Sequence, residues 1–316
     1  MTRRFHIGRG DRQLRWSRDV PPVVTVDPGQ QVTFDMCECT GGQLNESSTE
    51  ADVAKLKFEL CDPIFGPVYV NGAEPGDVLE VEFLKLEPGS WGFSALMPGL
   101  GLLSDEFSET AFKVFSIKPG DKHLVFKDGI RIPVRPMLGV AGISPGDPGD
   151  FSTIPPLDTG GNLDCRHLTE GVKLLLPVKV AGALFSCGDG HAVQGDGEVC
   201  GTGVECDMKA TLRFAVHKNM RHITSPHYDT SGCSRQESKD DIGSYATIGI
   251  DTDIREASRK AVRAMIEHLV ATKGLTRVEA YMLASVAGDL KFVEVVDMPN
   301  YAIASSLPLN VFVASE

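Results

Sequence analysis

The sequence has few aromatic residues, a deficit of positive charge and no long hydrophobic run. Aromatic side chains make up 7% of the 316 residues, which argues against a protein that stacks nucleic-acid bases on aromatic rings. Acidic residues outnumber basic ones by 43 to 31, and the net charge of −12 disfavours a polyanionic partner. No apolar stretch approaches the roughly 20 residues that span a bilayer. We therefore expect neither a nucleic-acid partner nor a membrane partner.

Several signatures of common enzyme and redox classes are also missing. No apolar segment follows Met1, so no secretory signal is predicted and the protein is expected in the cytoplasm. The eight cysteines include no Cys-x-x-Cys pair, which argues against a zinc knuckle or a thioredoxin motif. The absence of a phosphate-binding glycine loop disfavours a nucleotide cofactor.

Glycine and proline are abundant, at 33 and 19 residues, and they predict many tight turns between short strands. Residues 20–150 alternate strand patterns with turns, as in Val78–Phe83, where apolar and acidic residues alternate. Strand patterns return at 174–180 and 208–217.

The C-terminal part adds helices to this pattern. The clearest helix follows Asp253 and ends at Gly274, and a second is expected over residues 276–286. We predict a mainly β or α+β protein with β-sandwich-like or barrel-like β subdomains and a smaller C-terminal α+β part. Residues 1–316 are expected to form a single unit, subdivided into 20–150 and 151–316.

The first unusual segment is Gly160-Gly161-Asn162-Leu163-Asp164-Cys165-Arg166. Two glycines permit a sharp turn, and residues two apart in a strand project from the same face. Asp164 and Arg166 could therefore act together in a site. The alternative is a turn with a salt bridge.

The second unusual segment runs from Phe185 to Glu198 and contains four glycines among acidic residues and one histidine. Asp189 and His191 are two residues apart, as are Asp196 and Glu198, so in extended backbone each pair projects to one side. Carboxylates with one imidazole suit zinc or another divalent ion, and such an ion can activate water. The alternatives are a calcium-stabilised loop and a satisfied turn network, although the spacing does not fit an EF-hand.

Histidines and cysteines elsewhere give weaker candidates. His222 and His227 lie in a polar segment and are either ligands or solvated loop residues. Cys165, Cys187 and Cys200 are each either a nucleophile beside His191 or a buried inert thiol.

Four segments resemble one enzyme family. They are Gly66-Pro-Val-Tyr-Val-Asn-Gly-Ala-Glu74-Pro-Gly-Asp-Val-Leu-Glu-Val, Gly160–Arg166, Gly188-Asp-Gly-His191-Ala-Val-Gln-Gly-Asp-Gly-Glu198, and Gly288-Asp-Leu with Val295-Val-Asp297-Met-Pro-Asn300. The family is that of the acetamidases and formamidases, and the resemblance covers roughly residues 20 to 312. It implies hydrolysis of a short aliphatic amide to ammonia and a carboxylate, a β-rich fold and a homo-oligomer.

The same resemblance implies the roles of individual residues. Asp164, Asp189 and His191 are the expected ligands of a divalent metal, with zinc first and calcium as a structural alternative. Glu198 is expected to activate water or to be a further ligand. Glu38 is a second acid/base candidate, where the family more often carries Asp. Gln43 and Arg166 are candidates for substrate binding.

Two other functions stay open at this point. One is a cysteine-dependent amidase or nitrilase-like enzyme, which would respond to thiol alkylation and not to chelators. The other is a non-catalytic module that binds a metal or a small molecule without turnover.

Overall fold

The computed structural model describes residues 5–128, 130–233, 243–277, 280, 281, 284 and 288–312. Its strands are β1 (Phe5–Ile7), β2 (Arg12–Gln13), β3 (Val24–Val26), β4 (Gln31–Met36), β5 (Ile64–Val70), β6 (Val78–Pro88), β7 (Trp91–Leu96), β8 (Ala111–Ser116), β9 (His123–Lys127), β10 (Ile130–Pro133), β11 (Met137–Ile143), β12 (Pro156–Leu157), β13 (Gly160–Asn162), β14 (Lys173–Pro177), β15 (Phe185–His191), β16 (Met208–His217), β17 (His227–Asp229), β18 (Ser244–Asp251), β19 (Asp289–Glu294) and β20 (Tyr301–Pro308). The described helices are α1 (Glu50–Val53) and α2 (Ile254–Lys273), with 3₁₀ turns at Phe58–Leu60 and Leu309–Val311.

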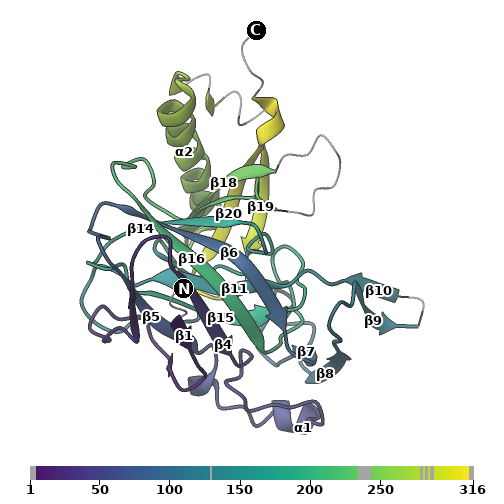
Figure 1. Ribbon diagram of the computed structural model, residues 1–316. Coiled ribbons are helices and arrows are strands. Elements are labelled where there is room, and N and C mark those ends of the chain that lie inside the picture. Colours follow the sequence, from purple (N-terminus) through teal and green to yellow (C-terminus); the bar gives the residue numbers. More distant parts are fainter. Residues whose placement is uncertain are drawn as a thin grey trace.

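Most of these strands belong to two large sheets (Figure 1). The first has the order β1-β4-β16-β6-β14-β17-β18-β20-β19, and the second has the order β12-β13-β11-β15-β5-β2, with β3 beside β5. Two smaller two-stranded sheets, β7–β8 and β9–β10, complete the β structure, and the β9–β10 pair projects from the body. The expected mainly β fold is confirmed.

The main core joins the two large sheets. The Phe185 ring of β15 lies 6.2 Å from the Phe34 ring of β4 and 5.2 Å from the Phe214 ring of β16, measured between centroids. All three side chains are fully buried. This packing is that of a sandwich, and the described strands do not close into a barrel.

Helix α2 lies along β18 and β20 at the C-terminal end of the first sheet (Figure 1). The Asp253 side chain accepts hydrogen bonds from the backbone of Arg255 and Glu256, and Gly274 ends the helix in left-handed conformation, as the sequence predicts. The second predicted helix, 276–286, lies largely outside the described residues. None of the helices in the described ranges is long and apolar enough to cross a membrane.

Residues on both sides of position 150 contribute strands to both large sheets. In the first sheet β16 lies between β4 and β6, and in the second sheet β15 lies between β5 and β11. The parts 20–150 and 151–316 therefore share their sheets and their core.

Candidate active site

Three neighbouring strands of the second sheet hold the two glycine-rich segments together. Strand β11 pairs with β13 on one side and with β15 on the other. Asp164 follows β13, and Asp189 and His191 belong to β15, which is buried along its whole length. Segments that lie 25 residues apart in the sequence thus meet across β11.

A glycine in β11, Gly139, leaves space for the side chains of Asp164 and Asp189. A Cβ atom at Gly139 would collide with the carboxylates of both Asp189 and Asp164. The Gly139 carbonyl also accepts the backbone N–H groups of Leu163 and Asp164, at 3.0 and 3.1 Å. Because Gly139 has no side chain, the carboxylates of Asp164 and Asp189 can approach each other over the middle of β11.

The convergence forms the wall of a cavity of about 230 Å³. Six carboxylates line it: Asp62, Asp164, Asp189, Glu198, Glu205 and Asp297. His191 and the thiols of Cys39 and Cys61 join them, and within the described residues no lysine or arginine lines the cavity. The lining also includes the apolar residues Leu44, Leu56, Phe93, Ala95, Met97 and Leu100. We refer to this space as the acidic cavity.

The backbone is strained at four of these acidic residues. The φ angles are +49° at Asp62, +40° at Asp164, +52° at Asp189 and +44° at Glu198. Residues other than glycine rarely occupy this left-handed region, and such conformations concentrate at functional sites. The strained backbone positions are therefore those of four acidic residues that line the cavity.

His191 is held between an amide and two carboxylates. Its Nδ1 lies 2.8 Å from Gln194 Oε1, and the Gln194 amide nitrogen donates to the carbonyls of Asp164 and Gly195, at 2.6 and 3.2 Å. Because the amide oxygen is therefore the atom that faces Nδ1, Nδ1 carries the proton in this hydrogen bond.

The other ring nitrogen of His191 faces only acceptors. Nε2 lies 3.0 Å from Asp189 Oδ1 and 2.8 Å from Glu205 Oε2. Two carboxylates and a basic nitrogen at these distances repel one another unless a proton or a metal cation lies among them.

The pKa values of these groups reflect the crowding of negative charge. Burial lowers the pKa of His191, but the charges of Asp189 and Glu205 outweigh burial and raise it well above the ordinary value. Burial raises the pKa of Glu205 and Asp297 to about 7 in each case, and it raises that of Glu198 well above the ordinary range. Six carboxyl groups thus line a cavity with one histidine among its described residues, and they cannot all ionise there without a further cation.

Asp164 shows most directly that the carboxyl groups of the cavity lack positive partners. Both of its carboxylate oxygens are buried and have no hydrogen-bond partner among the described residues. Its pKa is raised by burial first and then by the charges of Glu198, Asp189 and Asp297. Buried carboxylate oxygens almost always have a donor or a cation, so these oxygens indicate a missing positive partner.

Two sets of donor atoms in the acidic cavity have the spacing of a metal site. Asp164, His191 and Glu198 each offer a ligand atom within 4.8 Å of the others, and Cys39, Asp189 and Glu205 form a second such set. Oxygen, imidazole and thiol donors together fit zinc or a similar divalent ion.

The structure brings four of the predicted site residues to the acidic cavity. These are Asp164, Asp189, His191 and Glu198, although Glu198 rather than Asp189 groups with Asp164 and His191. Asp196 does not accompany Glu198. It lies 3.7 Å from both Arg166 and His167 instead, because positive φ angles at Gly197 and Glu198 interrupt the extended backbone that the prediction assumed.

The structure does not bring Glu38, Gln43 or Arg166 to the cavity lining. The Glu38 carboxylate accepts hydrogen bonds within its own loop, from the hydroxyl and backbone N–H of Thr40 and from the backbone of Gly42. The Gln43 amide bonds to the backbone of Thr40 and Lys57. Arg166 lines a different hollow, described below. Glu38 and Gln43 therefore stabilise a loop.

The remaining histidine candidates lie in another part of the molecule. His227 is fully buried, and its Nδ1 lies 2.7 Å from the hydroxyl of Tyr245. His222 and His227 both pack against His268 of α2. They therefore belong to the packing between α2 and the sheet.

The cysteine candidates also lie away from the acidic cavity. Cys165, Cys187 and Cys200 are absent from its described lining. Burial raises the pKa of Cys165 to about 12 and that of Cys187 well above the ordinary value. None of the three thiols therefore lines the cavity that contains His191, and burial favours the protonated form of Cys165 and Cys187.

Sequence reasoning missed five residues of the site. Glu205, Asp297, Asp62, Cys39 and Gln194 all contact the cavity or His191. Asp297 lies in the C-terminal family motif, and Glu205 follows the central motif by seven residues, so the motifs could have pointed to both. Cys39 and Asp62 carry no local signal, because only the tertiary fold brings them to β15.

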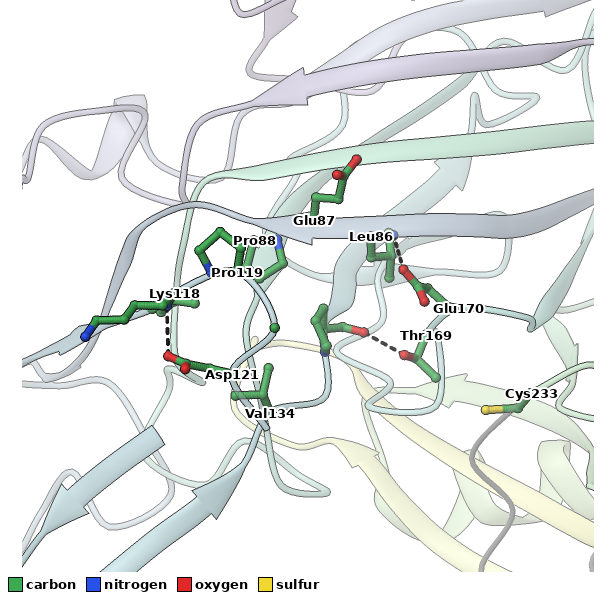
Figure 2. A pocket seen from close by; sticks show the side chains of 13 residues that line it. Leu86, Glu87, Pro88, Lys118, Pro119, Asp121, Val134, Thr169, Glu170 and Cys233 are labelled. Carbon is green, nitrogen blue, oxygen red and sulfur yellow. Dashed lines mark hydrogen bonds between the residues drawn. The ribbon is translucent and has the colours of Figure 1, made fainter. Parts of the chain in front are cut away.

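A second hollow shows what an ordinary polar surface looks like in this protein (Figure 2). It measures about 390 Å³, and three of its polar side chains bond to the backbone. Glu170 accepts the backbone N–H of Leu86 at 2.7 Å, and Thr169 donates to a backbone carbonyl at 2.7 Å (Figure 2). Asp121 accepts the backbone N–H of Lys118. Such satisfied groups give no sign of a site.

Comparisons with known proteins agree with the geometry. A sequence model described as the Acetamidase/Formamidase family matches residues 3–148 and 149–314. The crystal structure of an acetamidase from Bacillus halodurans superposes with a TM-score of 0.88 at 31% identity and covers 98% of each chain. A structure from Thermoanaerobacter tengcongensis, described as a predicted acetamidase/formamidase, gives 0.86 at 30% identity, with 96% and 95% covered. The formamidase of Methylophilus methylotrophus is 26% identical over 96% of this chain and 90% of its own.

Proposed function

The chain belongs to the acetamidase/formamidase family, and we propose that it hydrolyses a short aliphatic amide to a carboxylate and ammonia in the acidic cavity. The observation that carries the proposal is the set of buried carboxylates around His191, in which both oxygens of Asp164 lack a donor among the described residues. Hydrolysis of an amide needs an activated water, stabilisation of an oxyanion and protonation of the leaving nitrogen.

We propose that a divalent ion, with zinc as the first candidate and calcium as a structural alternative, is held by Asp164, Asp189 and His191, and that Glu198, which lies within 4.8 Å of Asp164 and His191, acts beside the ion. When bound, such an ion supplies Lewis acidity toward the amide carbonyl and lowers the pKa of water. The unpaired oxygens of Asp164 and the mixed donor set support this part of the proposal.

The side chains of the chain supply proton transfer and orientation. Glu198 is our candidate to accept a proton from water and to deliver it to the leaving nitrogen. Its Oε1 lies 3.9 Å from His191 Nδ1, and burial raises its pKa, which favours a carboxyl group that can hold a proton near neutral pH. Gln194 fixes the orientation of His191 through Nδ1.

The size and the walls of the cavity support a small substrate. About 230 Å³ is below the usual range for drug-sized ligands, which begins near 300 Å³. Apolar side chains, among them Phe93, Ala95 and Met97, line the same cavity as the carboxylates, so they can contact the alkyl group of a short amide. This lining favours an amide with a short alkyl chain.

The test is ammonia release from formamide, acetamide and propionamide by the purified protein. It is measured before and after chelation, and again after zinc is added back. We expect release that is lost on chelation and restored by zinc, with His191→Ala as the control for contaminating amidase. Release that resists the chelator but stops after thiol alkylation would replace this mechanism with a cysteine-dependent one. Bound metal without turnover of any amide would favour a binding module.

We also propose a homo-oligomer in the cytoplasm. All eight cysteines are free, in keeping with a reducing compartment. Leu102, Phe107 and Val199 are 57%, 52% and 58% exposed and line one apolar hollow, a surface that association could cover. Light scattering of the purified chain at several concentrations tests the assembly, and a monomer at all of them would refute it.

A further inference from the structure

A hollow of about 630 Å³ lies next to the acidic cavity. Its lining includes Arg135, Arg166, Gln194, Thr202, Phe115 and Phe126. Thr202 lines both this hollow and the acidic cavity, so the two spaces share a wall. We call this space the basic hollow.

The basic hollow carries an excess of positive charge. Arg166 lies 3.7 Å from Asp196, a longer distance than a direct hydrogen bond. Arg135 forms no ion pair within 4 Å among the described residues, and Lys291 of β19 adds a third positive charge to the surroundings of Asp196. Three cations thus face one carboxylate in a protein whose net charge is −12.

The arginines also have unused hydrogen-bonding groups. The Nε atoms of Arg135 and Arg166 are buried and have no partner among the described residues. The neighbouring His167 adds no charge, because burial and the three cations lower its pKa to about 3. Unpaired guanidinium donors beside a hollow are the groups that bind carboxylate and phosphate oxygens.

Aromatic rings form another part of the wall. Phe115 is almost fully buried, whereas Phe126 of the projecting β9–β10 hairpin is 41% exposed. Lys113 Nζ lies 5.6 and 4.8 Å from the centroids of these two rings, which places a further cation near them. A ligand in this hollow therefore meets cationic donors and apolar surface together.

We propose that the basic hollow binds an organic carboxylate, with its anionic head on Arg135 and Arg166 and its apolar part against Phe115 and Phe126. The aromatic wall distinguishes this ligand from an inorganic anion, which has no apolar part to place against the rings. Gln194 lines the hollow and also bonds to His191 Nδ1, so an occupied hollow contacts a residue that orients the acidic cavity. The inference does not depend on amide hydrolysis.

The test is binding of benzoate to the purified full chain by isothermal titration calorimetry, without any amide substrate. Neutral benzyl alcohol and inorganic phosphate are titrated beside it. We expect saturable binding of benzoate, weaker binding of phosphate and none of the alcohol. Arg135→Ala and Arg166→Ala should each weaken benzoate binding about tenfold or more, which is the usual effect of losing a hydrogen bond to a charged group. Arg255→Ala, which removes an exposed charge on α2, should leave it unchanged.

Two further variants separate this site from the acidic cavity and from a folding defect. Phe126→Ala, at an exposed position, should weaken binding of benzoate but not of acetate. His191→Ala should leave benzoate binding within about twofold. The proposal is overturned if benzoate does not bind, if both arginine variants bind it as tightly as the original chain does, or if only His191→Ala abolishes binding. Equal affinity for phosphate and benzoate would overturn the assignment of an organic carboxylate.

Discussion

Two buried histidine environments in this protein have opposite electrostatics. In the acidic cavity His191 lies against Asp189 and Glu205, and its pKa is raised although burial opposes the charge. Beside α2, His227 and His268 are buried with Tyr245, whose ring lies 3.7 Å from that of His268. There burial lowers the pKa of His227 well below its ordinary value and that of His268 to about 4.

The comparison teaches that burial of a histidine does not by itself mark a functional site. The two environments differ in their neighbours: one gathers carboxylates that lack positive partners, and the other gathers neutral rings. A structural cluster lowers its electrostatic cost by staying neutral, whereas the acidic cavity keeps charges that only a cation or protons can balance. The predictions below test whether this contrast holds.

The largest effect is expected from His191→Ala. The variant removes the one imidazole that faces Asp189 and Glu205, so bound metal should fall and amide hydrolysis should drop to background. This loss should exceed the about 10²- to 10³-fold that removal of one oxyanion-stabilising donor costs. Metal content by atomic emission and ammonia release measure it. An undiminished metal content would remove His191 from the ligand set.

Glu198→Gln should have the next largest effect. An amide cannot carry the proton that Glu198 is proposed to transfer, so kcat should fall by about 10²- to 10⁴-fold, with little loss of metal. Unchanged activity would refute this role. A parallel loss of metal and activity would make Glu198 a ligand.

Glu38→Gln is the matched control for that variant. Glu38 is equally buried, but its carboxylate serves Thr40 and Gly42 of its own loop. We expect a loss of about 1–3 kcal/mol in the free energy of unfolding, measured by urea denaturation, and a kcat near that of the original chain. A large loss of kcat in the folded variant would return Glu38 to the site.

Gly139→Ala should give a smaller but specific loss of activity. The added Cβ collides with the carboxylates of Asp164 and Asp189, so both must shift, and misplacement by about 1 Å can cost 10²-fold in rate. Gly195→Ala, where a Cβ meets no atom within 4 Å, is the control and should retain activity. Equal activity of the two variants would show that convergence over β11 is not required.

Local sequence patterns predicted part of the fold and part of the candidate site. The same-side projection of Asp189 and His191 follows from strand periodicity, as does the extent of β16, and the end signals of α2 predict its limits. The prediction that Asp196 and Glu198 project to the same side was wrong, because positive φ angles at Gly197 and Glu198 turn the chain there.

The rest could not be read from local patterns because it depends on contacts distant in sequence. Cys39, Asp62 and Asp297 reach His191 from segments about 100 or more residues away. Equally, the sequence does not reveal that β16 lies between β4 and β6. Nor does a polar loop containing His227 indicate that this side chain is fully buried under α2.

The smallest effect is expected in the other environment, on the pH dependence of stability. The pKa of His268 is lowered to about 4, by burial first and then by the charges of His222 and Lys273, against 6.5 for an ordinary histidine. Above pH 6.5 both folded and unfolded chains hold His268 neutral, so its contribution is fully present there. Between pH 6.5 and 4 the unfolded chain takes up a proton that the folded chain excludes, and stability falls as the pH falls.

His268→Gln should therefore flatten this part of the pH profile. The shift corresponds to roughly 3 kcal/mol between pH 6.5 and 4, as an upper limit. Urea denaturation at pH 7, 5.5 and 4.5 measures the slope, and His123→Gln, at an exposed position on β9, is the control that should keep the original slope. Because His268 is remote from the acidic cavity, amide hydrolysis at pH 7 should be unchanged. If the slope stayed the same in His268→Gln, the loss of stability in acid would have to come from other groups, and the carboxylates and histidine of the acidic cavity would be the next to test.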